Sequence, residues 1–298
     1  MKIVGIMMQR DELDIVLYNV LHHLDFVGLD QFIVADNGST DGSLEALYRL
    51  AETEPRLRVV EMAGPYDQAR RVNSLYQMAL ENDADWVVPL DADEFLPVGR
   101  DRLERALDQC LAPAIRINVR NFVQSHSVDK RDITSIAKIR FFARPRGSSG
   151  KSEYLVNSGE LSYIESRYPK KYIWRANKNL RIHKGNHGGD GVGPDRAKSR
   201  ITLYHAPIRS RAHLEMRRKR IARLDTTIPA QSWHTRRLSL MTDQQLAREW
   251  QVNSAWFGVL WHGRRIRLLW FSPFFPKLVS RYERRVNLLL GEGDSGAH

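Results

Sequence analysis

Strand-like and helix-like segments alternate along the first hundred residues, and this alternation limits the folds open to the chain more than any other feature. Short apolar runs have the length and composition of buried strands, at residues 2–8, 31–35, 57–61 and 86–90. Apolar side chains recur at helical spacing between them, at residues 12–27, 43–54 and 67–82. Strands that alternate with helices form right-handed crossovers. The sequence therefore predicts an α/β fold with a mostly parallel central sheet flanked by helices.

A cluster of acids follows the fourth strand-like run. Asp91, Asp93 and Glu94 come directly after the apolar residues 86–90. Like charges this close repel one another, and a parallel strand delivers them to the carboxyl edge of the sheet, where open α/β folds bind their ligands. Carboxylate oxygens suit a hard divalent cation, Mn2+ or Mg2+, that also holds a diphosphate. We expect Asp91 and Asp93 to hold such an ion, and an acidic turn that caps the next helix is the alternative.

Further candidates lie on the same edge. Asp36 ends the second strand-like run, and its carboxylate can accept a hydrogen from a pyrimidine ring. Arg70 and Arg71 lie near the start of the helix at 67–82, where a guanidinium can hold diphosphate oxygens. A turn acid and surface arginines are the alternatives. Residues 37–41 are expected to shape the turn rather than to contact a ligand.

Four segments, in this order, resemble the family 2 glycosyltransferases with a GT-A fold, and more closely their branch with an Asp-Ala-Asp-Glu-Phe signature. The segments are residues 3–12, 34–42, 70–73 and 85–96. The resemblance implies a Rossmann-like GT-A domain and the transfer of a sugar from a nucleotide diphosphate sugar, of the UDP or GDP type, to a glycan or other hydroxyl acceptor. It further implies that Asp36 contacts the base and that Arg70 and Arg71 approach the diphosphate. Asp91 would then contact ribose and metal, and Asp93 the metal.

The resemblance is thinner in the second half, at residues 172–175, 183–190 and 204–210. It implies that a histidine from this region completes the metal shell, with His205 as the first candidate and His187 as the second. A structural hydrogen-bonding role is the alternative for both. A zinc site at His183 and His187 is disfavoured, because no third soft ligand is evident.

The family resemblance also implies an inverting transfer, which needs a carboxylate to take the proton from the acceptor hydroxyl. Many family members carry a Glu-Asp pair for this purpose in their second half, and this sequence has no clear counterpart. Glu160 and Asp190 are the nearest candidates by position. A structural role is the alternative for each.

Charge is distributed unevenly along the chain. Residues 1–150 carry 18 basic and 23 acidic side chains, and residues 151–298 carry 28 and 12, so the halves have net charges of −5 and +16. The basic half predicts an anionic partner, which is a phosphate, an anionic lipid or a nucleic acid, unless it is only a solvated surface. A basic nucleic-acid-binding protein is the alternative from another functional class, and the basic half favours it. A nucleic acid is nevertheless not expected as a partner, because the acidic edge would repel its backbone unless a metal intervened. A nucleotidyltransferase is the nearest alternative enzyme, but residues 7–11 lack its Gly-rich phosphate loop.

Two domains are expected, a GT-A domain at 1–210 and a basic, aromatic-rich, mainly helical extension at 211–298. Further strands are predicted at 114–122 and 136–143, functional loops at 151–194, and helices at 211–224 and 243–253. Aromatic side chains alternate with arginines between Trp256 and Phe275, a pattern that suits either an anionic membrane interface or burial against protein. Pro273 and Pro276 are expected to break a helix there.

Composition indicates the compartment. Cys110 is the only cysteine, which rules out an internal disulfide and fits a reducing environment. The apolar start at residues 1–8 is too short for a secretory signal, and no apolar run reaches the length of a membrane span. We therefore expect a cytoplasmic protein, which the basic aromatic stretch would hold peripherally at the inner face of the membrane. The family resemblance implies a role in surface glycan synthesis.

Overall fold

The computed structural model describes residues 1–62, 64, 67–222, 232–263 and 265–291. Contacts divide the chain into two units, and each combines segments that are distant in sequence. Unit 1 comprises residues 1–119 and 169–204 with the described part of 281–298, and unit 2 comprises residues 120–168 and 205–280. The expected division into continuous domains at 1–210 and 211–298 is of a different kind, and it stays a prediction.

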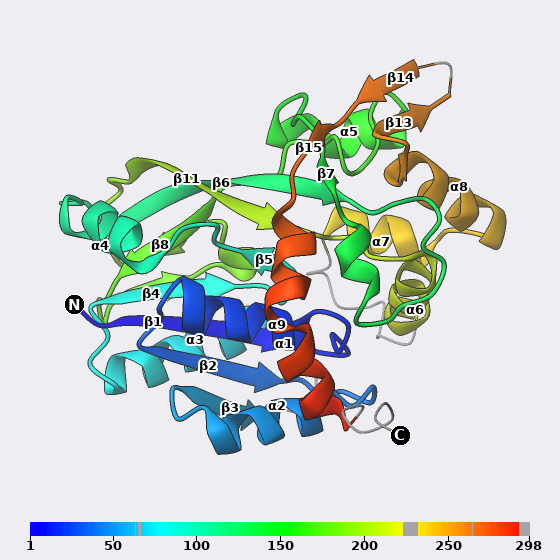
Figure 1. Ribbon diagram of the computed structural model, residues 1–298. Helices are drawn as coiled ribbons and strands as arrows, with labels where there is room; N and C mark the ends of the chain where they lie inside the picture. The colour runs from blue at the N-terminus through cyan, green and yellow to red at the C-terminus, as the bar shows by residue number, and fades with distance from the viewer. Residues whose placement is uncertain (63, 65–66, 223–231, 264, 292–298) are drawn as a thin grey trace. The chain divides into compact units, whose positions relative to one another are not determined.

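The central sheet of unit 1 is mostly parallel, as predicted. Its parallel strands lie in the order β3-β2-β1-β4 (Figure 1), namely β3 (Leu57–Glu61), β2 (Gln31–Asp36), β1 (Ile3–Gln9) and β4 (Trp86–Leu90). Two antiparallel strands continue it beyond β4, first β8 (Lys171–Arg175) and then β6 (Ala114–Val123). The short strands β5 (Glu94–Phe95), β9 (Arg181–Ile182) and β10 (Gly189–Asp190) also belong to this unit, as does all but the last residue of the longer strand β11 (Ala197–His205). The expected α/β class is confirmed.

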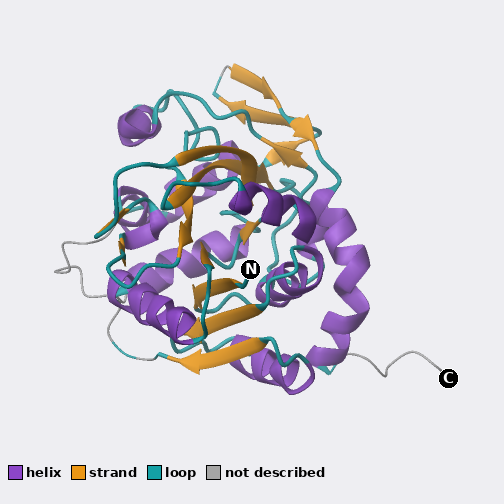
Figure 2. Cartoon of the chain, turned by 90° about the vertical axis from the view of Figure 1, so that its left-hand side faces the viewer, coloured by secondary structure: helices purple, strands orange, loops and turns teal. Residues whose placement is uncertain are grey.

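Helices cover both faces of the parallel strands (Figure 2). They are α1 (Val16–Leu21) with the π-helical turn His22–Phe26, α2 (Ser43–Thr53), α3 (Gln68–Glu81) and α4 (Arg100–Asp108). Because β4 lies on the opposite side of β1 from β2 and β3, right-handed crossovers place α3 on one face and α1 with α2 on the other. The carboxyl ends of β1, β2 and β4 therefore meet at one edge.

The expectation that residues 151–194 form loops without a core is wrong for β8. Ile173 and Trp174 are completely buried, and β8 lies inside the sheet between β4 and β6. The strand escapes detection because it begins with Lys171 and ends with Arg175, so that its sequence is not a continuous apolar run. Lys171 is nevertheless buried, for a reason given by the site below.

The predicted strand at 136–143 is also wrong in its first half. Residues Ser135–Lys138 form a 3₁₀ turn, and only Phe141–Phe142 (β7) is extended. The turn forms because the Asp132 carboxylate accepts hydrogen bonds from the backbone N–H groups of Thr134 and Ser135, at 2.9 and 2.7 Å. Local side-chain capping outweighs the strand preference of the sequence here.

In its described residues, unit 2 combines helices with short strands. The helices are α5 (Ser152–Asn157), preceded by the 3₁₀ turn Ser149–Lys151, and α6 (Arg211–Ala222), α7 (Trp233–Ser239) and α8 (Asp243–Asn253). The helix predicted at 243–253 is confirmed, and it begins at a capping box formed by Thr242 and Gln245. The helix predicted at 211–224 is confirmed to residue 222, and residues 223–224 lie outside the described residues.

The aromatic C-terminal stretch forms strands before its helix. A three-stranded antiparallel sheet contains β12 (Ala255–Trp256), β13 (Val259–His262) and β14 (Arg265–Leu268), and β15 (Trp270–Phe271) pairs with β7. Helix α9 (Phe274–Leu290) starts directly after Pro273. Pro276 lies in its first turn, where no intrahelical N–H bond is lost, so the expectation that Pro276 breaks a helix is wrong. No helix within the described ranges is long and apolar enough to cross a membrane.

Candidate active site

The acids that follow β4 form a tight turn, residues 91–94, which we call the acid turn. The Glu94 side chain is completely buried, and its carboxylate accepts a hydrogen bond from the backbone N–H of Asp91 at 3.0 Å. Asn19 of α1 is also buried, and its amide donates to the carbonyl oxygens of Ala92 and Glu94, at 2.9 and 2.7 Å. Glu94 and Asn19 thus fix the backbone, and the side chains of Asp91 and Asp93 remain partly exposed.

Lys171 of β8 supplies a cation to this turn. Its Nζ lies 2.8 Å from a carboxylate oxygen of Asp91 and 2.9 Å from one of Glu94, and its side chain is 3% exposed. Burial disfavours the ammonium, but the two carboxylates outweigh this effect and raise the pKa of Lys171 above its ordinary value. The repulsion among the three acids is therefore partly relieved within the chain.

Two buried histidines brace the residues that follow the acid turn. The N–H of Leu96 donates to Nε2 of His23 at 3.2 Å, so the ring proton of His23 is on Nδ1, which donates to the Asn19 carbonyl at 2.9 Å. Nε2 of His22 donates to the carbonyl of Leu96 at 2.8 Å. Burial lowers the pKa of His22 to about 4 and the pKa of His23 well below its ordinary value. Both rings are neutral near pH 7.

Asp36 lies at the carboxyl end of β2 and is buried. One carboxylate oxygen accepts the backbone N–H groups of Gly38 and Ser39, at 2.8 and 2.9 Å, and the other accepts the Gln9 amide and the Ser39 hydroxyl. The side chain thus holds its own turn together. Contact between Asp36 and a nucleotide base stays a prediction.

The two arginines of α3 lie in different environments. Arg71 is buried, and its guanidinium donates to the side-chain oxygen of Asn37 and to the carbonyl of Gly64, the latter at 2.9 Å. Arg70 is exposed, and its backbone N–H is capped by the Asp67 carboxylate at 3.0 Å. Arg71 therefore ties the loops after β2 and β3 together, and Arg70 is the arginine exposed to solvent.

The 3₁₀ turn Lys184–Asn186 approaches the acid turn within unit 1. Gly185 and Asn186 line a small cavity of about 20 Å³ together with Asp91 and Lys171. Asn186 is fixed there, because its side chain accepts the Trp174 indole N–H at 2.8 Å and donates to the carbonyl of Tyr172 at 2.9 Å. His187 follows this turn and is exposed, and its Nδ1 lies 3.1 Å from the carbonyl of Lys170.

His205, at the end of β11, has the environment of a structural residue. It is buried, its Nδ1 lies 2.9 Å from the side-chain oxygen of Asn121, and the ring of Tyr168 packs edge-on at 4.6 Å. Its predicted role as the first metal ligand stays a prediction.

The two candidate bases are both exposed. Asp190 of β10 forms an ion pair with His183, whose Nε2 lies 2.8 Å from a carboxylate oxygen. Glu160 follows α5 in unit 2 and accepts a hydrogen bond from the Ser158 hydroxyl at 3.2 Å. The structure places Asp190 in the unit that contains the acid turn, and Glu160 in the other unit.

The chemistry of the acid turn fits a divalent ion that is held jointly by protein and ligand. In the described part of the chain, no three His, Cys, Asp or Glu side chains converge as a ready metal site. Mg2+ is typically bound by one or two carboxylates together with substrate phosphates, which does not require such a cage. Asp91 and Asp93 are partly exposed carboxylates on a rigid turn, so they suit that arrangement.

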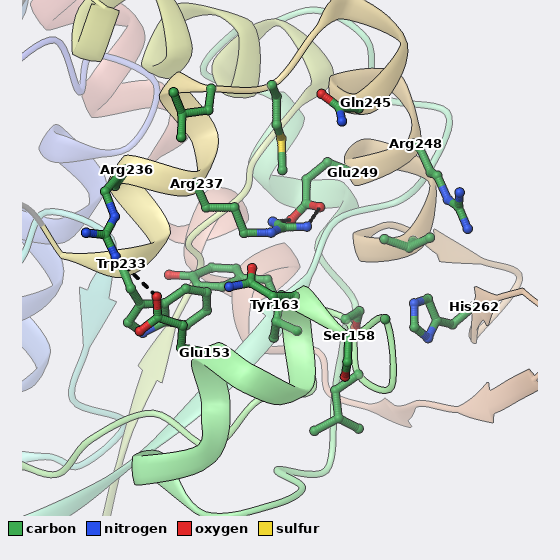
Figure 3. Close-up of a pocket in the computed structure, with 18 residues that line it drawn as sticks. Glu153, Ser158, Tyr163, Trp233, Arg236, Arg237, Gln245, Arg248, Glu249 and His262 are labelled. Carbon is green, nitrogen blue, oxygen red and sulfur yellow. Dashed lines mark hydrogen bonds and ion pairs between the residues drawn. The ribbon is translucent and has the colours of Figure 1, made fainter.

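A larger cavity, of 620 Å³, lies within unit 2 between α5, α7, α8 and β13 (Figure 3). Arg237 and Glu249 form a bidentate ion pair, with both N–O distances at 2.7 Å. A guanidinium nitrogen of Arg236 lies 3.4 Å from a carboxylate oxygen of Glu153. The side chains of Trp233 and Tyr163 also line the cavity. Their rings pack edge-to-face, with the ring centroids 6.0 Å apart. Its lining is therefore polar and aromatic, with most of its charge internally paired.

Sequence reasoning missed Asn19, His22, His23 and Lys171. The first three lie off the apolar stripe of residues 13, 16, 17, 20, 21 and 24, so the helical pattern gave no signal for them, and the fold buries this segment on every side. Lys171 gave no signal either, because its partners are distant in sequence.

Several solved structures are similar to this chain. A structure of S. aureus TarS, residues 1-349, with UDP shares 13% identity, covers 80% of this chain and 69% of that chain, and has a TM-score of 0.43. The same TarS fragment with UDP-GlcNAc shares 13% identity, covers 80% of this chain and 70% of that chain, and has a TM-score of 0.43. The mannosyltransferase PcManGT from Pyrobaculum calidifontis, with GDP-Man and Mn2+, shares 16% identity with this chain. The match covers 98% of this chain and 79% of that chain, with a TM-score of 0.37. A comparison with curated proteins found no match.

The family model described as Glycosyl transferase family 2 matches residues 7–156, which is half of the chain. The match includes the carboxyl end of β1, all of β2 and β4, and the acid turn, and so it spans most of the edge described above. This chain therefore belongs to glycosyl transferase family 2.

Proposed function

We propose that this chain is a metal-dependent glycosyltransferase that moves a sugar from a nucleotide diphosphate sugar to a hydroxyl acceptor during surface glycan synthesis. The observation that carries the proposal is the rigid acid turn at the carboxyl end of β4, on the same sheet edge as Asp36. In the registers, Gln9 pairs with Asp36 and Met7 with Leu90, so only β1 separates the two acids. Two strand spacings amount to about 10 Å, which a nucleotide diphosphate can span.

Within this proposal, Asp93 is the principal metal ligand. One oxygen of Asp91 is engaged by Lys171, so Asp91 can offer the ion or the ribose only its remaining oxygen. When bound, Mn2+ or Mg2+ would supply electrostatic stabilisation of the charge that develops on the departing diphosphate. Lys171 holds the Asp91 side chain in place through their 2.8 Å contact.

We assign the diphosphate contact to Arg70 rather than to Arg71, because Arg71 already binds Asn37 and Gly64 within the fold. For the metal shell we place His187 ahead of His205. His187 follows the turn that lines the small cavity with Asp91, whereas His205 is buried against Asn121 and Tyr168. Alanine at Arg70 should raise KM for the donor without lowering the melting temperature.

We propose an inverting transfer by single displacement, with a carboxylate that takes the acceptor proton. Asp190 is placed ahead of Glu160 for this role. It lies in the β9–β10 hairpin, and the segment that joins these two strands contains the 3₁₀ turn that approaches the acid turn. His183 can orient the Asp190 carboxylate through their 2.8 Å contact. The proposed compartment is the cytoplasm, which is consistent with Cys110 as the only cysteine.

For the acceptor, we propose a glycan held in the cavity of unit 2. Arg237 and Glu249 use only part of their hydrogen-bonding capacity on each other, so donors and acceptors remain for vicinal sugar hydroxyls. Trp233 and Tyr163 offer apolar ring surface to the C–H face of a sugar. Because Glu153 and Glu249 lie among the arginines, a strongly anionic ligand is disfavoured. The volume is within the range of about 300–1,000 Å³ typical of small-ligand sites.

The donor proposal is tested by thermal shift with a panel of UDP- and GDP-sugars, each with and without Mn2+. We expect one donor type to raise the melting temperature only when Mn2+ is present. No shift with any donor would contradict the proposal. The acceptor site is tested separately with Asn157→Trp, which narrows the cavity from the end of α5, and with Tyr154→Trp on the exposed side of the same helix as its control. Only the first should raise KM for the acceptor while donor hydrolysis is unchanged.

A further inference from the structure

Exposed apolar side chains gather in one short part of unit 2. Within the described residues, six large ones lie between positions 257 and 271, namely Phe257, Trp261, Ile266, Leu268, Trp270 and Phe271. Leu268 is 80% exposed and Ile266 64%. Contiguous exposed apolar surface on a folded protein typically marks an interaction site, whereas single exposed residues do not.

Strand register shows that the apolar residues of the β13–β14 hairpin share one face. Trp261 pairs with Ile266 and Val259 pairs with Leu268. Residues directly opposite each other in an antiparallel pair point to the same side, and so do residues two apart along a strand. Val259, Trp261, Ile266 and Leu268 therefore form a single apolar face.

The opposite face of the hairpin attaches it to unit 2. Leu260, which pairs with Arg267, is completely buried and belongs to a core cluster with Val123 and Ile164. Arg267 lies 3.5 Å from the buried carboxylate of Glu165. The hairpin, orange in Figure 1, is thus held by one face and presents an apolar face outward, which inverts the usual arrangement of an edge hairpin.

Exposed cations lie near this apolar face along the chain. Arg265 begins β14 on the opposite side of the hairpin, the side of Arg267, and is exposed, and Lys277 in the first turn of α9 is exposed as well. Trp270 and Phe271 of β15 add exposed aromatic rings between them along the chain. Aromatic rings with neighbouring cations are the composition of segments that lie in the interface of an anionic bilayer.

We propose that the β13–β14 hairpin docks this protein on an anionic membrane surface, with Trp261, Ile266 and Leu268 entering the interface. The basic side chains beside the hairpin favour an anionic lipid surface over a second copy of this chain, because two copies would bring the same cations together. The proposal does not depend on the glycosyltransferase reaction.

Co-sedimentation of the full chain with vesicles tests the proposal. We expect binding to vesicles of phosphatidylcholine with phosphatidylglycerol at low salt, weaker binding at high salt, and little binding to phosphatidylcholine alone. Leu268→Asp should reduce the bound fraction at least tenfold. Leu111→Asp, at a 97% exposed leucine of unit 1, is the matched control and should bind like the native chain.

Circular dichroism and donor hydrolysis in solution should be the same for both variants and the native chain. The proposal is overturned if the native chain stays in the supernatant with anionic vesicles, or if Leu268→Asp binds as well as Leu111→Asp. It is also overturned if light scattering finds a dimer that Leu268→Asp dissociates, because the face would then bind a second copy.

Discussion

The turns that follow β2 and β4 both begin with an aspartate at the same edge of the sheet, yet the two carboxylates are satisfied differently. Asp36 is buried, and both of its oxygens accept hydrogen bonds from Gln9, Gly38 and Ser39. Asp91 is partly exposed, and one of its carboxylate oxygens forms an ion pair with the ammonium of Lys171. Asp36 thus stabilises the turn to which it belongs, whereas the turn that contains Asp91 is stabilised by other residues. An acid at a strand end therefore indicates a binding role only when other groups maintain the backbone.

The largest effect is expected for Asp93→Asn, which removes a charge from the proposed metal-binding turn. The fold should persist, because Glu94 and Asn19 hold the backbone. A loss of about 4 kcal/mol in transition-state stabilisation would slow turnover about a thousandfold. Donor hydrolysis and transfer are measured at saturating Mn2+, with exposed Asp101→Asn as the control. If Asp93→Asn keeps most of its activity while folded, the acid turn has only a structural role.

Lys171→Met should destabilise the fold by about 3 kcal/mol, because it leaves the buried Glu94 carboxylate without its cation. Urea unfolding measures this loss, and exposed Lys178→Met should leave the midpoint unchanged. The double variant with Glu94→Gln should recover part of the stability, since it removes the unpaired charge. Additive losses in the two single variants would show that Lys171 and Glu94 do not interact energetically.

Acid should weaken the brace behind the acid turn. The folded pKa of His22 is about 4 and that of His23 is also lowered, so in the unfolded chain both histidines take up protons at higher pH than in the fold. Their stabilising contribution is complete above the unfolded pKa of about 6.5 and is lost as the pH falls below it, with a slope of about 1.4 kcal/mol per pH unit for each histidine. For His22 this loss extends down to about pH 4. Urea unfolding across this range measures the slope, and His22→Asn should reduce it. An unchanged slope in that variant would exclude His22 as its source.

His187→Ala and His205→Ala separate a ligand role from a structural role. We expect His187→Ala to raise the Mn2+ concentration for half activity about tenfold, as loss of one metal-shell group does. His205→Ala should instead lower the unfolding midpoint, because Asn121 loses a buried partner. A raised Mn2+ requirement in His205→Ala alone would reverse the assignment.

The smallest effect is expected for Asp36→Asn, the counterpart of Asp93→Asn in the turn after β2. Asparagine keeps one carbonyl oxygen for the N–H groups of Gly38 and Ser39, so the loss of stability should be about 1 kcal/mol. Thermal unfolding measures this loss, and donor KM is compared in the same preparation. A donor KM that rises strongly at unchanged stability would show that Asp36 serves the ligand more than its turn.

The sequence predicted the elements that rest on local pattern. The alternation of apolar runs and amphipathic helices indicated β1 to β4 and their parallel order, because burial on two faces requires such runs. The acid turn could also be predicted from local pattern, because three acids directly follow an apolar run. Residues 151–194 were misjudged, because β8 is buried by partners and not by its own hydrophobicity.

The sequence by itself determined the α/β class, the edge at which Asp36 and Asp91 lie, and the uneven charge of the two halves. Only the tertiary structure decided which carboxylates already have hydrogen-bond or ion-pair partners within the protein. Asp36 finds its hydrogen-bond donors nearby in the loops, but Asp91 and Glu94 meet Lys171 across 80 and 77 residues of chain. It also decided that Trp261 of β13 and Ile266 and Leu268 of β14 face outward. The physical reason is common to both, because the cost of a charge or an apolar ring depends on what the folded chain places beside it.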